Sequence, residues 1–184
     1  MSEINQYQAP QSQVDRQGPQ EYSQPKIFSV SGRIGRMRFL AYVMGAYLLI
    51  GIPFNLIATA MVAGLGEAGA MLSLAISALA TVVMFVFYFM FAIQRSHDMN
   101  SSGWLSLILL IPVIGFLVFI FVPGTYGENR FGSPPPANGA GVIILALLMP
   151  IIGIIGILAA IAIPAYQGYI EKAQQDQQQF EQQR

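Results

Sequence analysis

Four apolar stretches, each long enough to cross a lipid bilayer as a helix, constrain this chain more than any other feature. They cover Phe39 to Val62, Ala70 to Ile93, Trp104 to Val122 and Val142 to Tyr166. A helix needs about 20 apolar residues to span the hydrocarbon core, and lipid tolerates only helices or closed barrels. We therefore expect an all-α membrane protein, a small bundle of about four transmembrane helices with disordered polar termini.

The composition supports a chain that is covered largely by lipid. Only 10% of the residues are charged, whereas soluble domains carry about 25%. The net charge is zero and cysteine is absent, so we expect no nucleic-acid partner, no disulfide and no thiolate chemistry. His97 is the single histidine, and we expect neither a metal site nor a cofactor.

Four regions follow from these patterns. Residues 1–28 form a Gln- and Pro-rich tail without apolar periodicity, which predicts disorder. Residues 29–136 form a three-helix membrane domain, residues 137–166 contain an additional transmembrane helix, and residues 167–184 form a polar Gln-rich tail. Pro53 predicts a kink in the first helix, and Gly64 to Gly69 predict a short turn after it.

The basic residues predict the orientation of the chain in its membrane. Four crossings place the N-terminus, the loop 94–103 and the C-terminal tail on one side, with eight basic residues, and leave only Arg130 on the other. We therefore expect a multi-pass protein of a bacterial inner (plasma) membrane with both termini in the cytoplasm.

A second topology remains open, because the third apolar stretch contains a Pro-Gly break. If this stretch turns back at Ile111 to Gly115, it re-enters the membrane without crossing it. Arg130 is then cytoplasmic, the tail lies outside, and the basic count becomes seven against two. The charge count hardly separates the two topologies, whereas the length of 104–122 favours a simple crossing.

Three arginines precede the first apolar stretch: Arg33, Arg36 and Arg38. Basic residues beside a membrane gain about 1 kcal/mol each near an anionic surface, so they are candidates for contact with lipid head groups or a partner protein. Orienting the first helix is the alternative role. In a helix Arg33 and Arg36 share one face, although Gly32 and Gly35 favour an irregular start.

Two polar loops supply the other candidate residues for interaction or lipid contact. Arg95, His97 and Asp98 lie in the first loop, and adjacency of His97 and Asp98 does not make a catalytic pair. We expect a turn in which Arg95 caps the second helix, Asp98 or Ser101/Ser102 caps the third, and Trp104 anchors at the head groups. In the second loop, 123–132, Glu128 and Arg130 are expected to pair across a compact turn.

The apolar stretches contain no acidic or basic residue. Ion-coupled carriers usually keep such a charge at mid-depth, so its absence counts against active transport. Ser73, Ser77 and Thr81 recur every fourth residue, a spacing more typical of helix packing than of a pore lining.

Four motifs together resemble the bacterial inner-membrane proteins of the domain-of-unknown-function 805 family (DUF805), which includes the YhaH-like proteins. The motifs lie in order between about residues 28 and 136: Gly32-Arg33-x-x-Arg36-x-x-Phe39, Arg95-x-His97-Asp98 with Gly103-Trp104, Leu110-Ile111-Pro112-x-Ile114-Gly115, and Pro123-Gly124-Thr125-x-Gly127-Glu128-Asn129-Arg130-Phe131-Gly132. The resemblance implies a helical membrane protein and no assigned activity, so it supplies no catalytic residue.

The fourth apolar stretch resembles something else. Residues 154–169 are similar to the N-terminal helix of type IV pilins. Val142 and Leu147 occupy the positions of the pilin's processing glycine and helix glutamate, so pilin processing and assembly are not expected.

These features predict a protein that is not an enzyme. We expect a scaffold or accessory subunit that acts by helix–helix contacts, with the lipid bilayer, including anionic lipids, and a membrane protein or a second copy as partners. A small-solute channel or transporter is the alternative, and an accessory role in type IV pilus or secretion machinery is a weaker one.

Overall fold

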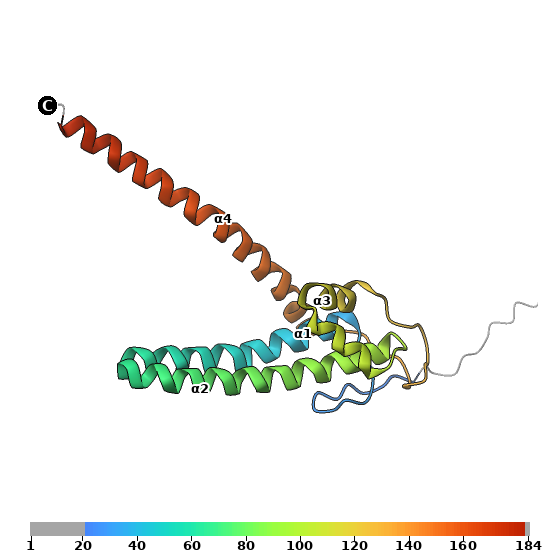
Figure 1. Cartoon of the computed structure of the whole chain (residues 1–184). Helices are drawn as coiled ribbons and strands as arrows, with labels where there is room; N and C mark the ends of the chain where they lie inside the picture. The colour runs from blue at the N-terminus through green and yellow to red at the C-terminus, as the bar shows by residue number, and fades with distance from the viewer. Residues whose placement is uncertain (1–20, 183–184) are drawn as a thin grey trace, which may run out of the picture.

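The computed structural model describes residues 21–182, and within this range every regular element is helical (Figure 1). The expected all-α fold is thereby confirmed. The expectation of disorder for residues 1–20 lies outside the described range. The elements are α1 (Arg36–Ala46), η1 (Tyr47–Gly51, a π-helix), α2 (Ile52–Asp98), η2 (Gly103–Leu110, a 3-10 helix), α3 (Pro112–Phe121) and α4 (Ala140–Gln182).

A long helical hairpin, Arg36–Asp98, forms the body of the molecule. The chain reverses within α2 at Gly66, whose φ of 57° and ψ of −128° are not helical, and Figure 1 shows the two arms side by side. A Cβ at Gly69 would lie 1.9 Å from the carbonyl oxygen of Met61, so only glycine fits there. The turn predicted at Gly64 to Gly69 is confirmed.

The first arm contains a π-helical turn instead of a simple proline kink. Pro53 has no N–H group and crowds the preceding turn. The five residues of η1 lie just before it, where the amide of Ile52 donates to the carbonyl of Tyr47. The Asn55 side chain donates to the carbonyl of Gly51 at 2.8 Å. The irregular backbone is therefore satisfied by the helix's own residues, not by a neighbouring helix.

The third apolar stretch is bent and does not form one straight helix. At about 2.0 Å per residue η2 is about 16 Å long, and at 1.5 Å per residue α3 is about 15 Å long, roughly half of a hydrocarbon core. Ile111 lies between them with extended backbone. A Cβ at Gly115 would lie 2.3 Å from the carbonyl oxygen of Ile108, which is how closely the two pieces approach. The bend lies at Ile111, where the re-entrant alternative placed it, and the expected simple crossing of residues 104–122 stays a prediction.

An aromatic cluster holds this bent segment against the hairpin. The ring of Phe39 in α1 contacts the rings of Tyr88 in α2 and of Phe116 and Phe119 in α3, with centroid distances of 6.2, 6.3 and 5.5 Å. Phe39 and Phe119 are fully buried. The core of the protein therefore lies where α1, the end of α2 and α3 meet.

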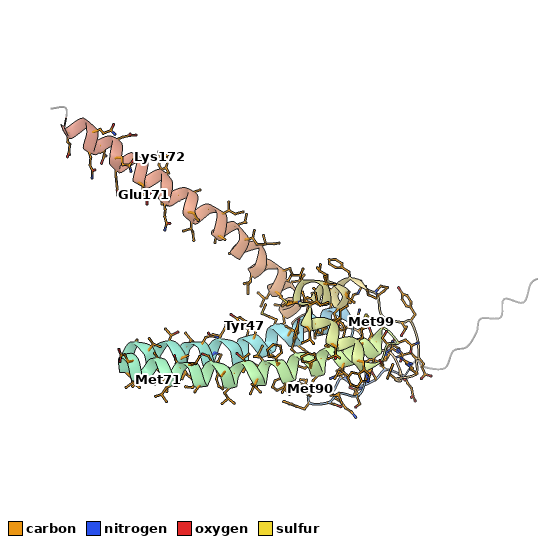
Figure 2. All side chains as sticks on the ribbon, viewed as in Figure 1. Tyr47, Met71, Met90, Met99, Glu171 and Lys172 are labelled. Atoms are coloured by element: carbon orange, nitrogen blue, oxygen red, sulfur yellow. The ribbon has the colours of Figure 1, made fainter. Side chains whose placement is uncertain are left out.

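The long helix α4 contacts this core only near its start. Val142, Leu145, Ala146 and Met149 pack against α1, after which α4 diverges from the hairpin (Figure 1). Figure 2 shows the side chains of its far part, around Glu171 and Lys172, standing clear of the rest of the molecule.

The expected disorder of the polar tail is wrong for residues 167–182, which continue α4 as a helix. Gln, Glu, Lys and Ala are good helix formers, and extending an existing helix avoids the cost of nucleation. Residues 21–28 contain no helix or strand, but hydrogen bonds from Ser23 to Pro134 and from Gln94 to Lys26 tie them to the folded chain.

Within residues 21–182, two helical stretches are long and apolar enough to cross a membrane, Arg36–Asp98 and Ala140–Gln179. Their outer surfaces carry many exposed leucine, isoleucine, valine and phenylalanine side chains. A face of this kind is expected where lipid is the solvent.

Candidate functional site

The three polar motifs, distant in sequence, meet at the end of the hairpin where α1 begins and α2 ends. Gly32, with a φ of +91°, turns the chain just before α1. The amide of Ile34 then donates to the carbonyl of Gln94 at 3.3 Å, and the Gln94 side chain donates to the carbonyls of Lys26 and Ser29. The segment before α1 is thereby fixed across the last turn of α2.

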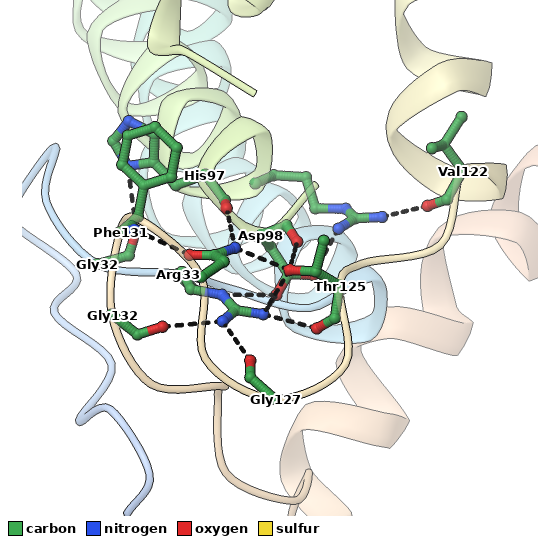
Figure 3. Close-up of polar contacts among 11 residues, drawn as sticks. Gly32, Arg33, His97, Asp98, Val122, Thr125, Gly127, Phe131 and Gly132 are labelled. Carbon is green, nitrogen blue, oxygen red and sulfur yellow. Dashed lines mark hydrogen bonds and ion pairs between the residues drawn. The ribbon is translucent and has the colours of Figure 1, made fainter. Parts of the chain in front are cut away.

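Asp98 lies between two arginines at the centre of this region (Figure 3). Its Oδ1 is 3.2 Å from Nη2 of Arg33, and its Oδ2 is 2.6 Å from Nη1 of Arg95. The three side chains are buried, with exposed fractions of 0% for both arginines and 6% for the aspartate. A buried carboxylate with one partner on each oxygen is the arrangement that offsets its loss of hydration.

Arg33 also binds the loop that follows α3. Its Nη1 donates to the carbonyls of Gly127 and Gly132 at 2.8 and 2.9 Å. Its Nη2 donates to the carbonyl of Thr125 at 2.8 Å. Figure 3 shows the loop wrapped around this guanidinium. Arg33 lies outside the helix, since α1 begins at Arg36, so the expected irregular start is correct.

Arg95 binds the end of α3. Its Nε donates to the carbonyl of Phe119 at 3.1 Å, and its Nη2 donates to the carbonyl of Val122. The expected cap of the second helix by Arg95 is therefore wrong, because Nε and Nη2 reach the end of α3 and Nη1 reaches the Asp98 carboxylate instead of a carbonyl of α2. Ser102 occupies the position before η2 without a side-chain cap, and Asp98 is engaged by the arginines, so the expected side-chain caps of the third helix are wrong too.

Thr125 and Asn129 complete the region that we call the polar cluster: Arg33, Arg95, Asp98, Thr125 and Asn129. The Thr125 amide and hydroxyl both donate to the backbone carbonyl of Asp98, at 2.8 and 3.0 Å. The Asn129 amide donates to the carbonyl of His97 and to the Thr125 hydroxyl, each at 2.8 Å. The loop thus pairs with the backbone of α2's last turn as well as with its side chains.

Gly124 shows how closely the loop approaches Asp98. A Cβ at this position would lie 2.0 Å from Oδ2 of Asp98. A side chain there would displace the carboxylate from its arginines, which gives a physical reason for glycine in this motif.

His97 belongs to a stack beside the cluster. The centroids of its ring and the Phe131 ring are 4.0 Å apart, and the two rings are nearly parallel, at 12°. The Arg130 guanidinium lies over the Phe131 ring, 4.7 Å from its centroid. His97 Nδ1 donates to the carbonyl of Gly32 at 3.2 Å. The ring therefore packs between the loop and the segment before α1.

The expected pair of Glu128 and Arg130 is wrong. Glu128 accepts a hydrogen bond from Ser133 at 3.0 Å, and Arg130 donates to the carbonyl of Asn100 at 3.0 Å. Both bonds are exposed, so they contribute little to stability.

The three N-terminal arginines do not form one surface. Arg33 is buried in the polar cluster, and Arg38 is buried with Nη2 donating to the carbonyl of Ala137 at 3.3 Å. Only Arg36 is exposed. The candidate contact with anionic head groups is therefore restricted to Arg36, and Arg33 and Arg38 hold protein backbone instead.

Burial governs the ionisation of this region, which lies beyond the apolar stretch that ends at Ile93. It lowers the pKa of Arg95 to about 10, which leaves the guanidinium charged at neutral pH. Burial also raises the pKa of the Asp98 carboxyl, and the charges of Arg95 and Arg33 oppose that shift. Burial lowers the pKa of His97, in the same direction as the charge of Arg130 and against the hydrogen bond to Gly32.

The arrangement joins segments and leaves few groups free for chemistry. In the part of the chain that the structure describes, no three His, Asp or Glu side chains gather as metal ligands. Gln94, Thr125 and Asn129 were not singled out from the sequence as site residues. The signal was present, because Thr125 and Asn129 belong to the last of the four motifs and Gln94 begins the polar loop.

Comparisons with known proteins agree with the extent of these motifs. The family model described as "Protein of unknown function (DUF805)" matches residues 27–133. Inner membrane protein YhaH of Escherichia coli (strain K12) is 33% identical over 104 residues, which cover 55% of this chain and 84% of the relative. Inner membrane protein YhaI of the same organism is 45% identical over 47 residues, 24% of this chain and 40% of the relative.

No solved structure matches this chain. The family match ends at residue 133, before α4, so the likeness of residues 154–169 to pilins stays a prediction. The matched region contains every residue of the polar cluster and the whole hairpin. The relatives are inner-membrane proteins and the helices are apolar, which together support an integral membrane protein. The chain belongs to the DUF805 family.

Proposed function

We propose that this protein is a non-enzymatic scaffold or accessory subunit of the inner membrane, acting through helix–helix contacts made by α4. This proposal rests on the uneven packing of α4 along its length. Its first residues pack on α1 through Val142, Leu145, Ala146 and Met149, whereas apolar side chains farther along, such as Ile155 and Ile157, are 60% and 64% exposed. A membrane helix fixed at one end and free along the rest is suited to pairing with another membrane helix.

The polar cluster supports a non-enzymatic role. Both oxygens of Asp98 are bound by buried arginines, and the His97 ring is stacked and hydrogen-bonded. General acid–base or nucleophilic catalysis needs a group with access to a substrate. These groups are occupied by contacts within the chain.

The alternative of a small-solute channel needs a continuous polar path. Ser73 donates to the carbonyl of Ala70 at 2.8 Å, and Thr81 donates to the carbonyl of Ser77 at 2.7 Å. These hydroxyls satisfy the backbone of their own helix, so this face offers a solute few free polar groups. This favours the scaffold over the channel.

A three-crossing topology goes with this proposal. The segment 103–122 starts just after the end of α2. Its last residues return to that end, where the carbonyls of Phe119 and Val122 accept hydrogen bonds from Arg95. The carbonyl of Ala137, three residues before α4, binds Arg38 at the start of α1. These contacts support a re-entrant segment and an α4 that leaves from the side where α1 begins.

The basic residues support the cytoplasm as that side, because seven of the nine then lie there and only Lys172 and Arg184 lie outside. The C-terminus is then periplasmic, in contrast to the topology favoured by segment length alone. A reporter that is active only in the periplasm, fused after Arg184, is expected to be active. An inactive fusion that is stably produced would instead support four crossings.

Site-specific crosslinking tests the scaffold role directly. The chain has no cysteine, so Ile157→Cys introduces a unique site for a photoreactive maleimide in native membranes. Val82→Cys on the hairpin is a matched control, since Val82 is 60% exposed and Ile157 is 64% exposed. We expect a crosslinked band from Ile157→Cys and none from Val82→Cys. Monomer alone from both variants would contradict the proposed role of α4.

A further inference from the structure

A cavity of about 630 Å³ lies between the two arms of the hairpin and the bent segment. We call it the lateral cavity. Small-molecule and cofactor sites typically enclose 300–1,000 Å³, so its size is that of a ligand site. Its walls include Val43, Tyr47 and Asn55 from the first arm and Ser77, Thr81 and Met84 from the second.

The lateral cavity is also lined by the bent segment and by α4. Leu109, Leu110 and Pro112 come from the tip of the bent segment, and Met149 comes from α4. The hairpin residues that line it belong to the apolar stretches 39–62 and 70–93. The cavity therefore lies in the part of the chain that is expected to be surrounded by lipid.

The π-helical turn shapes the wall. Isolated π-turns are rare and frequently lie at functional sites. Here the Tyr47 ring lies against Gly51, where a Cβ would be 2.7 Å from the ring. Both residues line the cavity, so the irregular turn forms part of its wall.

Two of the polar side chains on the wall already bind the backbone of their own helix. Asn55 donates to the carbonyl of Gly51 at 2.8 Å, and Thr81 donates to the carbonyl of Ser77 at 2.7 Å. No charged residue lines the cavity. A charged solute would lose its hydration there without a counter-charge, whereas a hydrocarbon has no such loss.

The length of the cavity suits an extended hydrocarbon chain. Val43 and Asn55, which both line it, are separated by about 18 Å along the arm at 1.5 Å per residue. The volume of about 630 Å³ leaves room for one such chain along the wall.

We propose that the lateral cavity binds one acyl chain of a membrane phospholipid. The chain lies along Val43 to Asn55 and contacts Leu110 and Pro112. The bound lipid fills the space between the arms that no side chain fills.

Native mass spectrometry of the full-length protein tests this binding. The protein is reconstituted with palmitoyl-oleoyl phosphatidylglycerol and then transferred to dodecyl maltoside. We expect one retained phospholipid per chain. Ser77→Phe fills the cavity and is expected to lower the lipid-bound fraction roughly tenfold, which corresponds to about 1.4 kcal/mol. Ser73→Phe, one turn away on the same arm and outside the lining, is the matched control and should retain the lipid.

A milder variant, Thr81→Leu, keeps the test valid if Ser77→Phe does not fold, and it should also reduce retention. Equal retention by wild type and a folded cavity variant would overturn the proposal. A dimer that only the cavity variants lose would also overturn it, because the occupant would then be a second copy of the chain. These outcomes are independent of the role proposed for α4, which is read from crosslinking at Ile157.

Discussion

The two ends of this protein are built on opposite principles. At the polar cluster, Arg33, Arg95 and Asp98 come from two distant segments and bind a third. The two arginines donate both to the Asp98 carboxylate and to backbone carbonyls of residues 119–132. Beyond Met149, the described side chains of α4 make no comparable polar contact, and apolar side chains such as Ile157 are exposed. One end is fixed by polar contacts within the chain, and the other is left to its surroundings.

The difference teaches where specificity comes from in a small membrane protein. Lipid tails are as apolar as leucine, so apolar surface alone does not determine which helix packs on which. Buried hydrogen bonds and ion pairs determine which helices pack together, because each wrong arrangement leaves a charge or a carbonyl unpaired. The polar cluster therefore defines one arrangement of α1, α2 and α3, while the free part of α4 is available for a partner.

Replacement of Asp98 by asparagine tests the fixed end of the molecule, where we expect the largest loss of stability. Asp98→Asn leaves two buried guanidinium groups without their counter-charge, which should lower the free energy of unfolding by about 3–5 kcal/mol. Titration from dodecyl maltoside into SDS measures the loss. Asp176→Asn, at an exposed position of α4, makes the same chemical change and should have no measurable effect. Equal losses of unfolding free energy in the two variants would show that the polar cluster does not stabilise the fold more than an exposed position does.

Glycine replacements sharpen the contrast, because the same change should have opposite signs at the two ends. Gly124→Ala places a Cβ 2.0 Å from Oδ2 of Asp98, so we expect a loss of about 1–3 kcal/mol from overpacking. Gly156→Ala in α4 meets nothing within 4 Å and should raise the free energy of unfolding by about 0.5–1 kcal/mol through helix propensity. A loss at Gly156 in detergent would mean that this part of α4 packs on the core.

Much of the architecture follows from local sequence. The hairpin is predicted by two apolar stretches and the glycines between them, and the start of α1 by Gly32 and Gly35. The path of residues 103–122 is not predicted, because it depends on Arg95 reaching the carbonyls of Phe119 and Val122. No local pattern encodes such a long-range bond.

The site shows the same limit. Arg33, Arg95 and Asp98 stand out in the sequence as polar residues beside apolar helices. Their meeting in space does not, because linear order says nothing about which loops lie at the same end. Composition also misleads at the C-terminus, where a Gln-rich segment predicts disorder although it extends α4 to Gln182.

Acidification should weaken the fixed end before the free one. Burial lowers the pKa of His97, so the unfolded chain binds a proton more readily than the folded chain. Stability is then unaffected above the unfolded pKa of about 6.5 and falls as the pH decreases below it. Arg130 covers the neighbouring ring and adds to this effect. Thermal unfolding in detergent between neutral and mildly acidic pH should show the loss, and His97→Asn should remove it.

The smallest effect is expected at the free end. Ile157→Ala removes an apolar side chain of α4 that is 64% exposed, so in detergent the free energy of unfolding should change by no more than about 0.5 kcal/mol. The matched substitution Leu109→Ala, at a position that is 7% exposed between η2 and the hairpin, should lose about 2–5 kcal/mol because it opens a void in the core. A loss at Ile157 as large as that at Leu109 would mean that α4 folds onto the hairpin, and it would remove the free face on which the scaffold proposal depends. A small effect in detergent together with a crosslink at Ile157 in native membranes requires that whatever contacts this face comes from outside the chain.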